Sequence, residues 1–352
     1  MRPDARESGG ARPSLSVVIP TMGRPILFKS LESLLASPDA GLIEIIIVGI
    51  IPDAAVSERV AALISGNPRV RHLPMRFETG DASRKRNAGF QEARADLVAF
   101  LDDDVYVPSH WIGRILDSFS APDVGMVSGP SLVPTDISLF ARLAGLALSS
   151  RAAGYVAHRY LRGAEARKRV KWSRIIGCNM VFRREAMERL GGFDPAFYPG
   201  EEMVAAFRTA RMGYALVFDS EAYVFHYPKT TFRGFWRQIF RYGATRVRLI
   251  RAGVDVEWTP LVPAAWVASL VVCAALAAVH VAGSWLLAAN VAAYFLVALA
   301  VTAEVVWQTR RFADSLLLPL LPFMHVAYGV GIWFEVVRPG RDLSDLMGRP
   351  TT

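Results

Sequence analysis

Three long apolar segments follow Thr259 and limit what the chain can fold into. They cover about residues 260–282, 284–307 and 314–337. Each is close to the ~20 residues that a helix needs to cross the hydrocarbon of a bilayer. We therefore expect three membrane helices within residues 259–337, a tight Gly-Ser turn at 283–284 between the first two, and a short tail at 338–352.

Positive charges flank these segments and predict their orientation. Arg310 and Arg311 separate the second and third segments, and the basic stretch "RQIFRYGATRVRLIRAG" precedes the first. Since cytoplasmic loops are enriched in arginine and lysine, we expect a multi-pass protein of the inner or plasma membrane with a cytoplasmic N-terminal domain. An odd number of crossings would place the C-terminus outside, although arginines in the tail leave the last crossing open. For Glu304 and His325, within the spans, three roles stay open: pairing between helices, lining an acceptor path, and helix packing.

The start of the chain and its overall charge exclude several classes. Residues 1–14 are polar without an apolar run, which predicts a disordered tail and not a signal peptide. The net charge of +8 indicates anionic partners, and since no nucleic-acid motif is present we expect phosphate groups and membrane lipid instead. Cys178 and Cys273 have no metal-ligand spacing, which favours a reducing compartment.

Residues 15–250 alternate between short apolar runs and amphipathic stretches. The runs "LSVVIPT", "IEIIIVGI", "RVRHLP" and "DLVAFL" predict strands, and a helix is expected after each of them. This alternation predicts an α/β domain with a mostly parallel sheet, whose ligands bind beyond the carboxyl ends of the strands. An insert at about 136–171, apolar on one side and rich in Arg and Lys, is expected to be helical, either on the membrane surface or packed on the domain.

Asp102, Asp103 and Asp104 stand directly after the buried strand "DLVAFL". Adjacent carboxylates repel one another, and a divalent cation relieves that repulsion. Mg²⁺ and Mn²⁺ prefer oxygen ligands and are often held by one or two carboxylates plus the phosphates of a substrate. The alternative is a solvated acidic turn that caps the following helix.

The stretches "SVVIPTMGRP", "RNAGFQEARADLVAFLDDD" and "GCNMVFRREAMERLGGFDPAFYPGEE" occur in an order that resembles family 2 glycosyltransferases of the GT-A fold, over about residues 15–245. The resemblance implies a Rossmann-like domain, a nucleotide-sugar donor and Mg²⁺ or Mn²⁺. The donor-binding residues that it implies are Pro20, Thr21, Arg24, Arg86, Asp102 and Asp103. It implies that Asp104 and Asp102 bind the metal and that Glu202 occupies the place of the catalytic base.

The acceptor or diphosphate side is implied by the stretch "QIFRY" and by the acidic pair. Its residues are Glu201, Gln238, Arg241 and Tyr242. His226 is either a third metal ligand, a diphosphate contact or a satisfied strand-end histidine. Trp236 and Tyr242 either stack on an acceptor sugar or dock their helix.

The sequence departs from the family at the position that usually reads the nucleobase. Gly49 stands where an acidic residue is usual, and Asp53 follows four residues later, so UDP, GDP and dTDP donors all stay open. Val204 and Ala205 replace a further acidic residue after the pair.

The function that these features predict is an inverting, metal-dependent transfer of a sugar to a hydroxyl of a lipid-linked or polysaccharide acceptor, in envelope or exopolysaccharide synthesis. Transfer to polyprenyl phosphate, a processive synthase and a non-catalytic membrane scaffold of the same fold are the alternatives.

Overall fold

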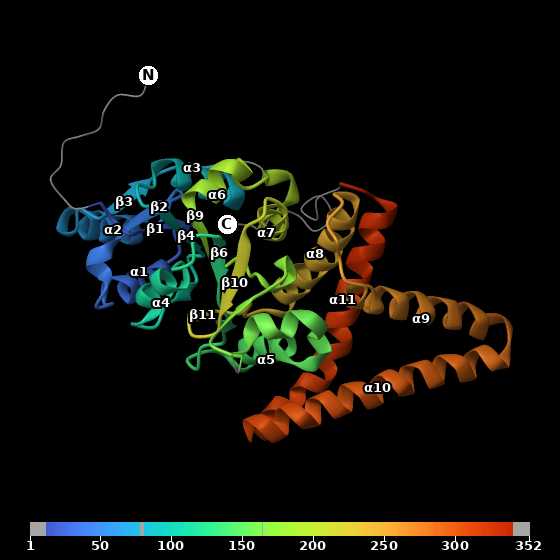
Figure 1. Ribbon diagram of the computed structural model, residues 1–352. Helices are drawn as coiled ribbons and strands as arrows, with labels where there is room; N and C mark the ends of the chain where they lie inside the picture. Colours follow the sequence, from blue (N-terminus) through green and yellow to red (C-terminus); the bar gives the residue numbers. More distant parts are fainter. Residues whose placement is uncertain (1–11, 78–80, 164, 341–352) are drawn as a thin grey trace.

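The computed structural model of the chain describes residues 12–77, 81–163 and 165–340. Most of the two tails expected at 1–14 and 338–352 lies outside these residues. Figure 1 shows an α/β domain at one end of the molecule and long helices at the other.

An eight-stranded sheet forms the centre of the domain, with strand order β3-β2-β1-β4-β9-β6-β10-β8. Parallel pairing joins β1 to β2 and β4, and β10 to β6, whereas β9 runs antiparallel to both of its neighbours. The mostly parallel sheet predicted from the sequence is therefore confirmed. The strand bounds are β1 Leu15–Pro20, β2 Ile43–Val48, β3 Val70–Leu73, β4 Leu97–Leu101, β6 Val124–Ser128, β8 Arg167–Arg169, β9 Asn179–Arg183 and β10 Ala215–Asp219.

Helices cover both faces of this sheet, which explains why its central strands are apolar throughout. Every residue of β1, β2 and β4 is buried. On one face, Val17 and Ile19 of β1 pack with Leu31 and Ile112 of neighbouring helices, while Val18 belongs to the core of the opposite face. Parallel strands enclosed in this way read as continuous apolar runs. The helices are α1 Leu27–Leu35, α2 Ala54–Gly66, α3 Asp81–Glu92, α4 Trp111–Ser118, α6 Arg184–Leu190 and α7 Glu201–Arg211.

The insert predicted as helical over 136–171 is helical only in its first part. Helix α5, Leu139–Ser149, is followed by 3₁₀ turns over Arg151–Tyr160, and the basic residues Arg167–Arg169 then form strand β8. This strand pairs antiparallel with β10 at the edge of the sheet. The helix prediction was wrong there because the pairing partner lies about 50 residues further along the chain and leaves no local pattern.

Three apolar helices long enough to cross a membrane follow the domain, as predicted. Helix α8, Phe232–Arg251, leads into α9, Val262–Val279, then α10, Val281–Thr309, and α11, Leu317–Val337. The tight turn lies at His280 and not at 283–284. Gly283 is instead a close-approach position inside α10, where a Cβ would lie 2.2 Å from the backbone nitrogen of Ala277.

The two polar side chains noted within the apolar segments do not pair with each other. His325 of α11 bonds the Tyr294 hydroxyl of α10 at 2.6 Å and the carbonyl oxygen of Ala152 at 2.8 Å. Glu304 pairs with Arg151 at 3.0 Å. Both therefore connect the apolar helices to each other or to the segment after α5.

Candidate active site

Each of the three aspartates after β4 has a cationic or hydrogen-bonding partner, which offsets their mutual repulsion. Asp103 points to the loop after β1, where it accepts hydrogen bonds from the Thr21 hydroxyl at 2.7 Å and the Met22 amide at 3.2 Å and pairs with Arg24. Asp102 is bound by Arg86 at 2.7 Å. Asp104 faces the imidazole of His226, 3.2 Å away.

His226 reaches this place through a small second sheet. Strand β11, Val224–His226, pairs with β5, Val105–Tyr106, and with β7, Ser131–Leu132. The register sets His226 opposite Val105, directly after Asp104. A short strand from far along the chain thereby places an imidazole nitrogen beside a carboxylate pair.

The groups of Asp102, Asp104 and His226 fit one divalent cation. Their ligand atoms lie within 4.8 Å of one another. Carboxylate oxygens suit both Mg²⁺ and Mn²⁺, and an imidazole nitrogen favours Mn²⁺, because Mg²⁺ is the harder ion. Burial would raise the pKa of Asp104, but His226 and Arg24 lower it well below its usual range. The carboxylate is therefore ionised. Because His226 acts on Asp104 as a cation, a metal ion that bound both groups would displace the proton of the imidazole.

Arg86 of α3 joins the two acidic clusters of the site. It is buried, and its guanidinium binds Asp102 and Glu201. Burial opposes its charge, yet Asp102 and Glu201 raise the pKa of Arg86 above its ordinary value. Its Nε has no hydrogen-bond partner in the described part of the chain. A fixed cation of this kind beside a candidate metal site suits an anionic ligand such as a diphosphate.

The acidic pair at the start of α7 divides into two different environments. Glu201 is 2% exposed, binds Arg86 and accepts a hydrogen bond from the Gly200 amide at 3.0 Å. Burial and the neighbouring Glu202 raise the pKa of Glu201 to about 7. Glu202 is half-buried and, among the described residues, makes no hydrogen bond or ion pair. A Cβ at Gly177 would lie 3.2 Å from its Cγ, so that glycine leaves room for the Glu202 side chain.

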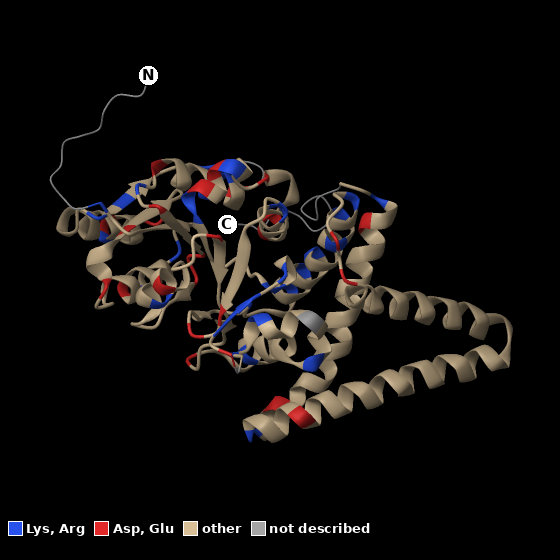
Figure 2. Cartoon of the chain, in the orientation of Figure 1, with Lys and Arg blue, Asp and Glu red and all other residues tan. Residues whose placement is uncertain are grey.

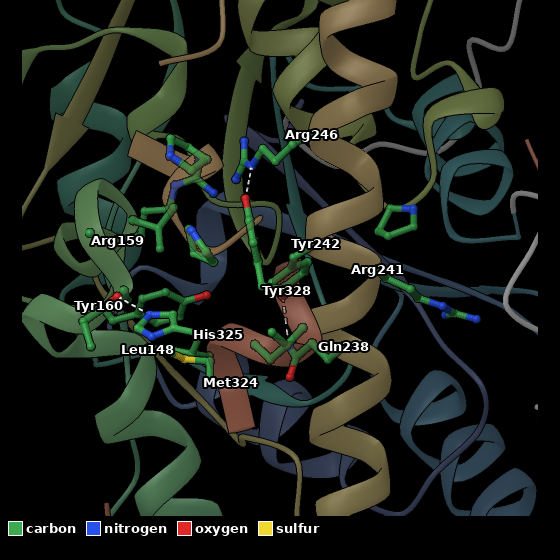
Figure 3. Close-up of a pocket in the computed structure, with 18 of the residues that line it drawn as sticks. Leu148, Arg159, Tyr160, Gln238, Arg241, Tyr242, Arg246, Met324, His325 and Tyr328 are labelled. Carbon is green, nitrogen blue, oxygen red and sulfur yellow. Dashed lines mark hydrogen bonds between the residues drawn. The ribbon is translucent and has the colours of Figure 1, made fainter. Parts of the chain in front are cut away.

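A pocket of about 1130 Å³ connects these groups to the apolar helices. The predicted site residues in its lining are Arg86, Asp102, Glu201, Glu202, His226, Gln238, Arg241 and Tyr242. Five predicted site residues lie outside that lining, in the loop after β1 or in contact with it: Pro20, Thr21, Arg24, Asp103 and Asp104. The pocket continues past Tyr242 to Met324, His325 and Tyr328 of α11, as Figure 3 shows.

The aromatic residues of α8 have separate roles. Trp236 packs on Phe323 of α11 with ring centroids 4.8 Å apart, so it docks the helix. Tyr242 lines the pocket, and its hydroxyl accepts a hydrogen bond from Gln238 at 2.9 Å. Tyr160, which sequence reasoning missed, lines the same pocket, and burial raises its pKa to about 12. Nothing in the local sequence distinguishes Tyr160, because it reaches the pocket through the 3₁₀ turns after α5.

Backbone geometry explains the missing acidic residue after β2. Gly49 has φ +153, and a Cβ there would lie 2.1 Å from the carbonyl oxygen of Thr21. No side chain fits between these two loops. Asp53 is occupied as the N-cap of α2, accepting the Val56 amide at 3.0 Å. Recognition of the base by an acidic side chain at position 49 is therefore sterically excluded.

We expect Gly49→Ala to lower the free energy of unfolding by about 1–3 kcal/mol or more, because the clash is with backbone and the φ value is strained. The loop carrying Thr21 would shift, so the affinity for nucleotides should fall as well. The matched control is Gly66→Ala, where no atom lies within 4 Å of the added Cβ. Thermal unfolding in detergent measures both variants, and equal midpoints would contradict the steric argument.

Comparisons of the sequence with known proteins identify relatives of this chain. A pre-mycofactocin glycosyltransferase of Mycobacterium tuberculosis is 27% identical over 170 residues, covering 47% of this chain and 34% of the relative. The O-antigen biosynthesis protein RfbC of Myxococcus xanthus is 25% identical over 240 residues, covering 63% of this chain and 18% of the relative. The chain thus spans about a third or less of the length of these relatives.

Among solved structures, the mannosyltransferase PcManGT of Pyrobaculum calidifontis, in complex with GDP-Man and Mn²⁺, has the same fold. The TM-score is 0.55 at 18% identity, with 93% of this chain and 88% of that chain covered. The sequence model described as "Glycosyltransferase like family 2" matches residues 13–245, which include the sheet, the acidic triplet and the acidic pair. On this match the chain belongs to the family 2 glycosyltransferases.

Proposed function

We propose that the protein is an inverting, metal-dependent glycosyltransferase that moves a sugar from a nucleotide-sugar donor to a hydroxyl of a lipid-linked saccharide in envelope or exopolysaccharide synthesis. One observation carries this proposal. A single pocket is lined by the candidate donor groups Arg86 and Asp102, by Glu202 and by the apolar helices α9–α11. In the described part of the chain Glu202 has no hydrogen-bond partner. Such a pocket suits an acceptor whose reactive end is polar and whose other end is lipid.

The residues of the site have complementary tasks in such a transfer. A cation bound by Asp102, Asp104 and His226 would offset the negative charge that develops on the departing nucleoside diphosphate. Arg86, held by two carboxylates, offers a preorganised positive charge to the same phosphates. Glu202 takes the proton of the attacking hydroxyl, and attack from the face opposite the leaving group inverts the anomeric centre.

The acceptor end of the pocket is both basic and apolar. Its lining includes Arg151, Arg159, Arg237, Arg241 and Arg246. It also includes apolar side chains of the long helices, among them Val297, Val301 and Met324. A lipid carrying phosphate close to its sugar matches both features. The same arginines favour a second candidate, direct transfer to a polyprenyl phosphate, whose oxygen is already anionic and needs no base.

We further propose that the apolar helices attach the catalytic domain to the cytoplasmic side of the inner or plasma membrane. Figure 2 shows the basic residues gathered on α8 and on the strand in front of it, and α9 and most of α10 without charge. Basic residues beside uncharged helices are typical of the cytoplasmic side of a membrane. A domain held there has access both to nucleotide-sugars in solution and to lipid-linked acceptors.

The test is a donor panel on the full-length protein in detergent. Binding of UDP-, GDP- and dTDP-sugars is measured by calorimetry with Mn²⁺, with Mg²⁺ and without a cation. We expect one nucleotide class to bind, only with cation, and more tightly with Mn²⁺. Lack of cation-dependent affinity for every donor would exclude this activity and favour the non-catalytic scaffold.

A further inference from the structure

We infer that the bilayer holds only the hairpin of α9 and α10, and that α11 lies along α8 at the membrane surface. The segment after α11, at residues 338–340, then stays on the side of the catalytic domain. This assignment gives two crossings where three apolar helices are available.

Both ends of α11 are bound to the catalytic domain. Just before its start, the fully buried Asp314 accepts two hydrogen bonds from Arg142 of α5, at 2.9 and 2.8 Å. At its end, Glu335 pairs with Arg248 of α8 at 3.0 Å and with Arg251 at 3.5 Å. A helix that crossed the bilayer would carry these two ends to opposite sides of the hydrocarbon. One compact domain cannot bind both ends across that distance.

The middle of α11 is in close backbone contact with α8. A Cβ at Gly243 of α8 would lie 2.0 Å from the carbonyl oxygen of Tyr328, and one at Gly331 of α11 would lie 2.1 Å from that of Phe240. Phe334 also packs on Phe240, with ring centroids 5.4 Å apart. The two helices therefore share one environment along most of their length. Glycines at such crossings allow no lipid between the backbones.

That shared environment is not hydrocarbon, because α8 is strongly basic. Its arginines are Arg233, Arg237, Arg241, Arg246, Arg248 and Arg251. Arginine is strongly unfavourable at the centre of a bilayer, and α11 cannot enter without taking α8 with it. An amphipathic basic helix suits the interface between head groups and water.

The hairpin has the opposite properties. In the most apolar 18-residue stretch of each helix, the buried share is 6% for α9 and 11% for α10, against 44% for α11. No Asp, Glu, Lys or Arg occurs between Glu257 and Glu304. In Figure 1 the turn between α9 and α10 lies far from the domain, and α11 lies between the domain and the hairpin. The 18 residues of α9 extend ~27 Å at 1.5 Å per residue, close to the thickness of the hydrocarbon.

Single cysteines in the full-length protein test this topology. Val279→Cys lies beside the turn, Arg338→Cys follows α11, and Glu58→Cys on α2 marks the catalytic domain. A membrane-impermeant maleimide is applied to intact and to permeabilised cells, and the parent protein gives the background of Cys178 and Cys273. Val281→Cys is a second position near the turn, since Val281 is 68% exposed in the native chain. The thermal unfolding midpoint of each variant in detergent verifies that it is folded.

We expect the positions near the turn to be labelled in intact cells. Positions 338 and 58 should be labelled only after permeabilisation. Labelling of position 338 in intact cells would overturn the inference and favour three crossings. Labelling of both turn positions only after permeabilisation would overturn it as well, since the hairpin would then not cross. Neither outcome bears on the donor panel, so the topology and the proposed activity are tested separately.

Discussion

Replacing Asp104 by alanine is expected to abolish cation-dependent donor binding and to lower turnover by about 10³-fold or more. Asp104 is buried, bound by His226 at 3.2 Å and by Arg24 at 3.1 Å, and its carboxylate lies within 4.8 Å of the other candidate ligands. Removing it leaves Asp102 and His226, which is one ligand fewer for an ion that already relies on substrate phosphates. Calorimetry with Mn²⁺ and the preferred nucleoside diphosphate measures the loss.

The matched control for this variant is Asp96→Ala. Asp96 is a surface aspartate just before β4, its side chain is 72% exposed, and its ion pair is with Arg12. Exposed pairs of this kind contribute about 0–1 kcal/mol, so folding and binding should be unchanged. Undiminished Mn²⁺-dependent affinity in Asp104→Ala would show that the acidic triplet is not the metal site and would remove the basis of the proposed chemistry.

The sequence was sufficient to predict the centre of the domain. Strands β1, β2 and β4 are buried on both faces and therefore appear as unbroken apolar runs, and the helices between them keep a local period. The order of the acidic triplet and the acidic pair was also enough to indicate the family. Features of this kind depend on neighbouring residues, which is why they can be read without a structure.

Features that depend on distant pairing could not be predicted in the same way. Strand β8 exists because β10 offers it an open edge, and its own residues, Arg167–Arg169, carry no apolar pattern. Asp103 resembled its neighbours in sequence, but Thr21 and Met22 turn it away from the pocket. Tyr160 enters the site from turns whose course depends on packing against other segments.

Glu202→Gln is expected to lower turnover by about 10²–10⁴-fold while donor affinity stays unchanged. Glutamine keeps the shape of the side chain but cannot accept a proton. In the described part of the chain Glu202 has no hydrogen-bond partner, so the substitution breaks no contact that holds Arg86 or the candidate metal ligands. Glu201→Gln differs in this respect, because Glu201 binds Arg86 and should affect donor binding. The control is Glu188→Gln on α6, whose side chain is 59% exposed.

The outcome of this substitution separates the two acceptor chemistries. A sugar hydroxyl must lose its proton as it attacks, so the loss of the base lowers turnover at saturating donor. A phosphate oxygen is anionic at neutral pH and attacks without a base, so turnover would be retained. Turnover is therefore measured under saturating donor with a lipid-linked saccharide and with polyprenyl phosphate. Full activity of Glu202→Gln on the phosphate would replace the hydroxyl acceptor by the second candidate.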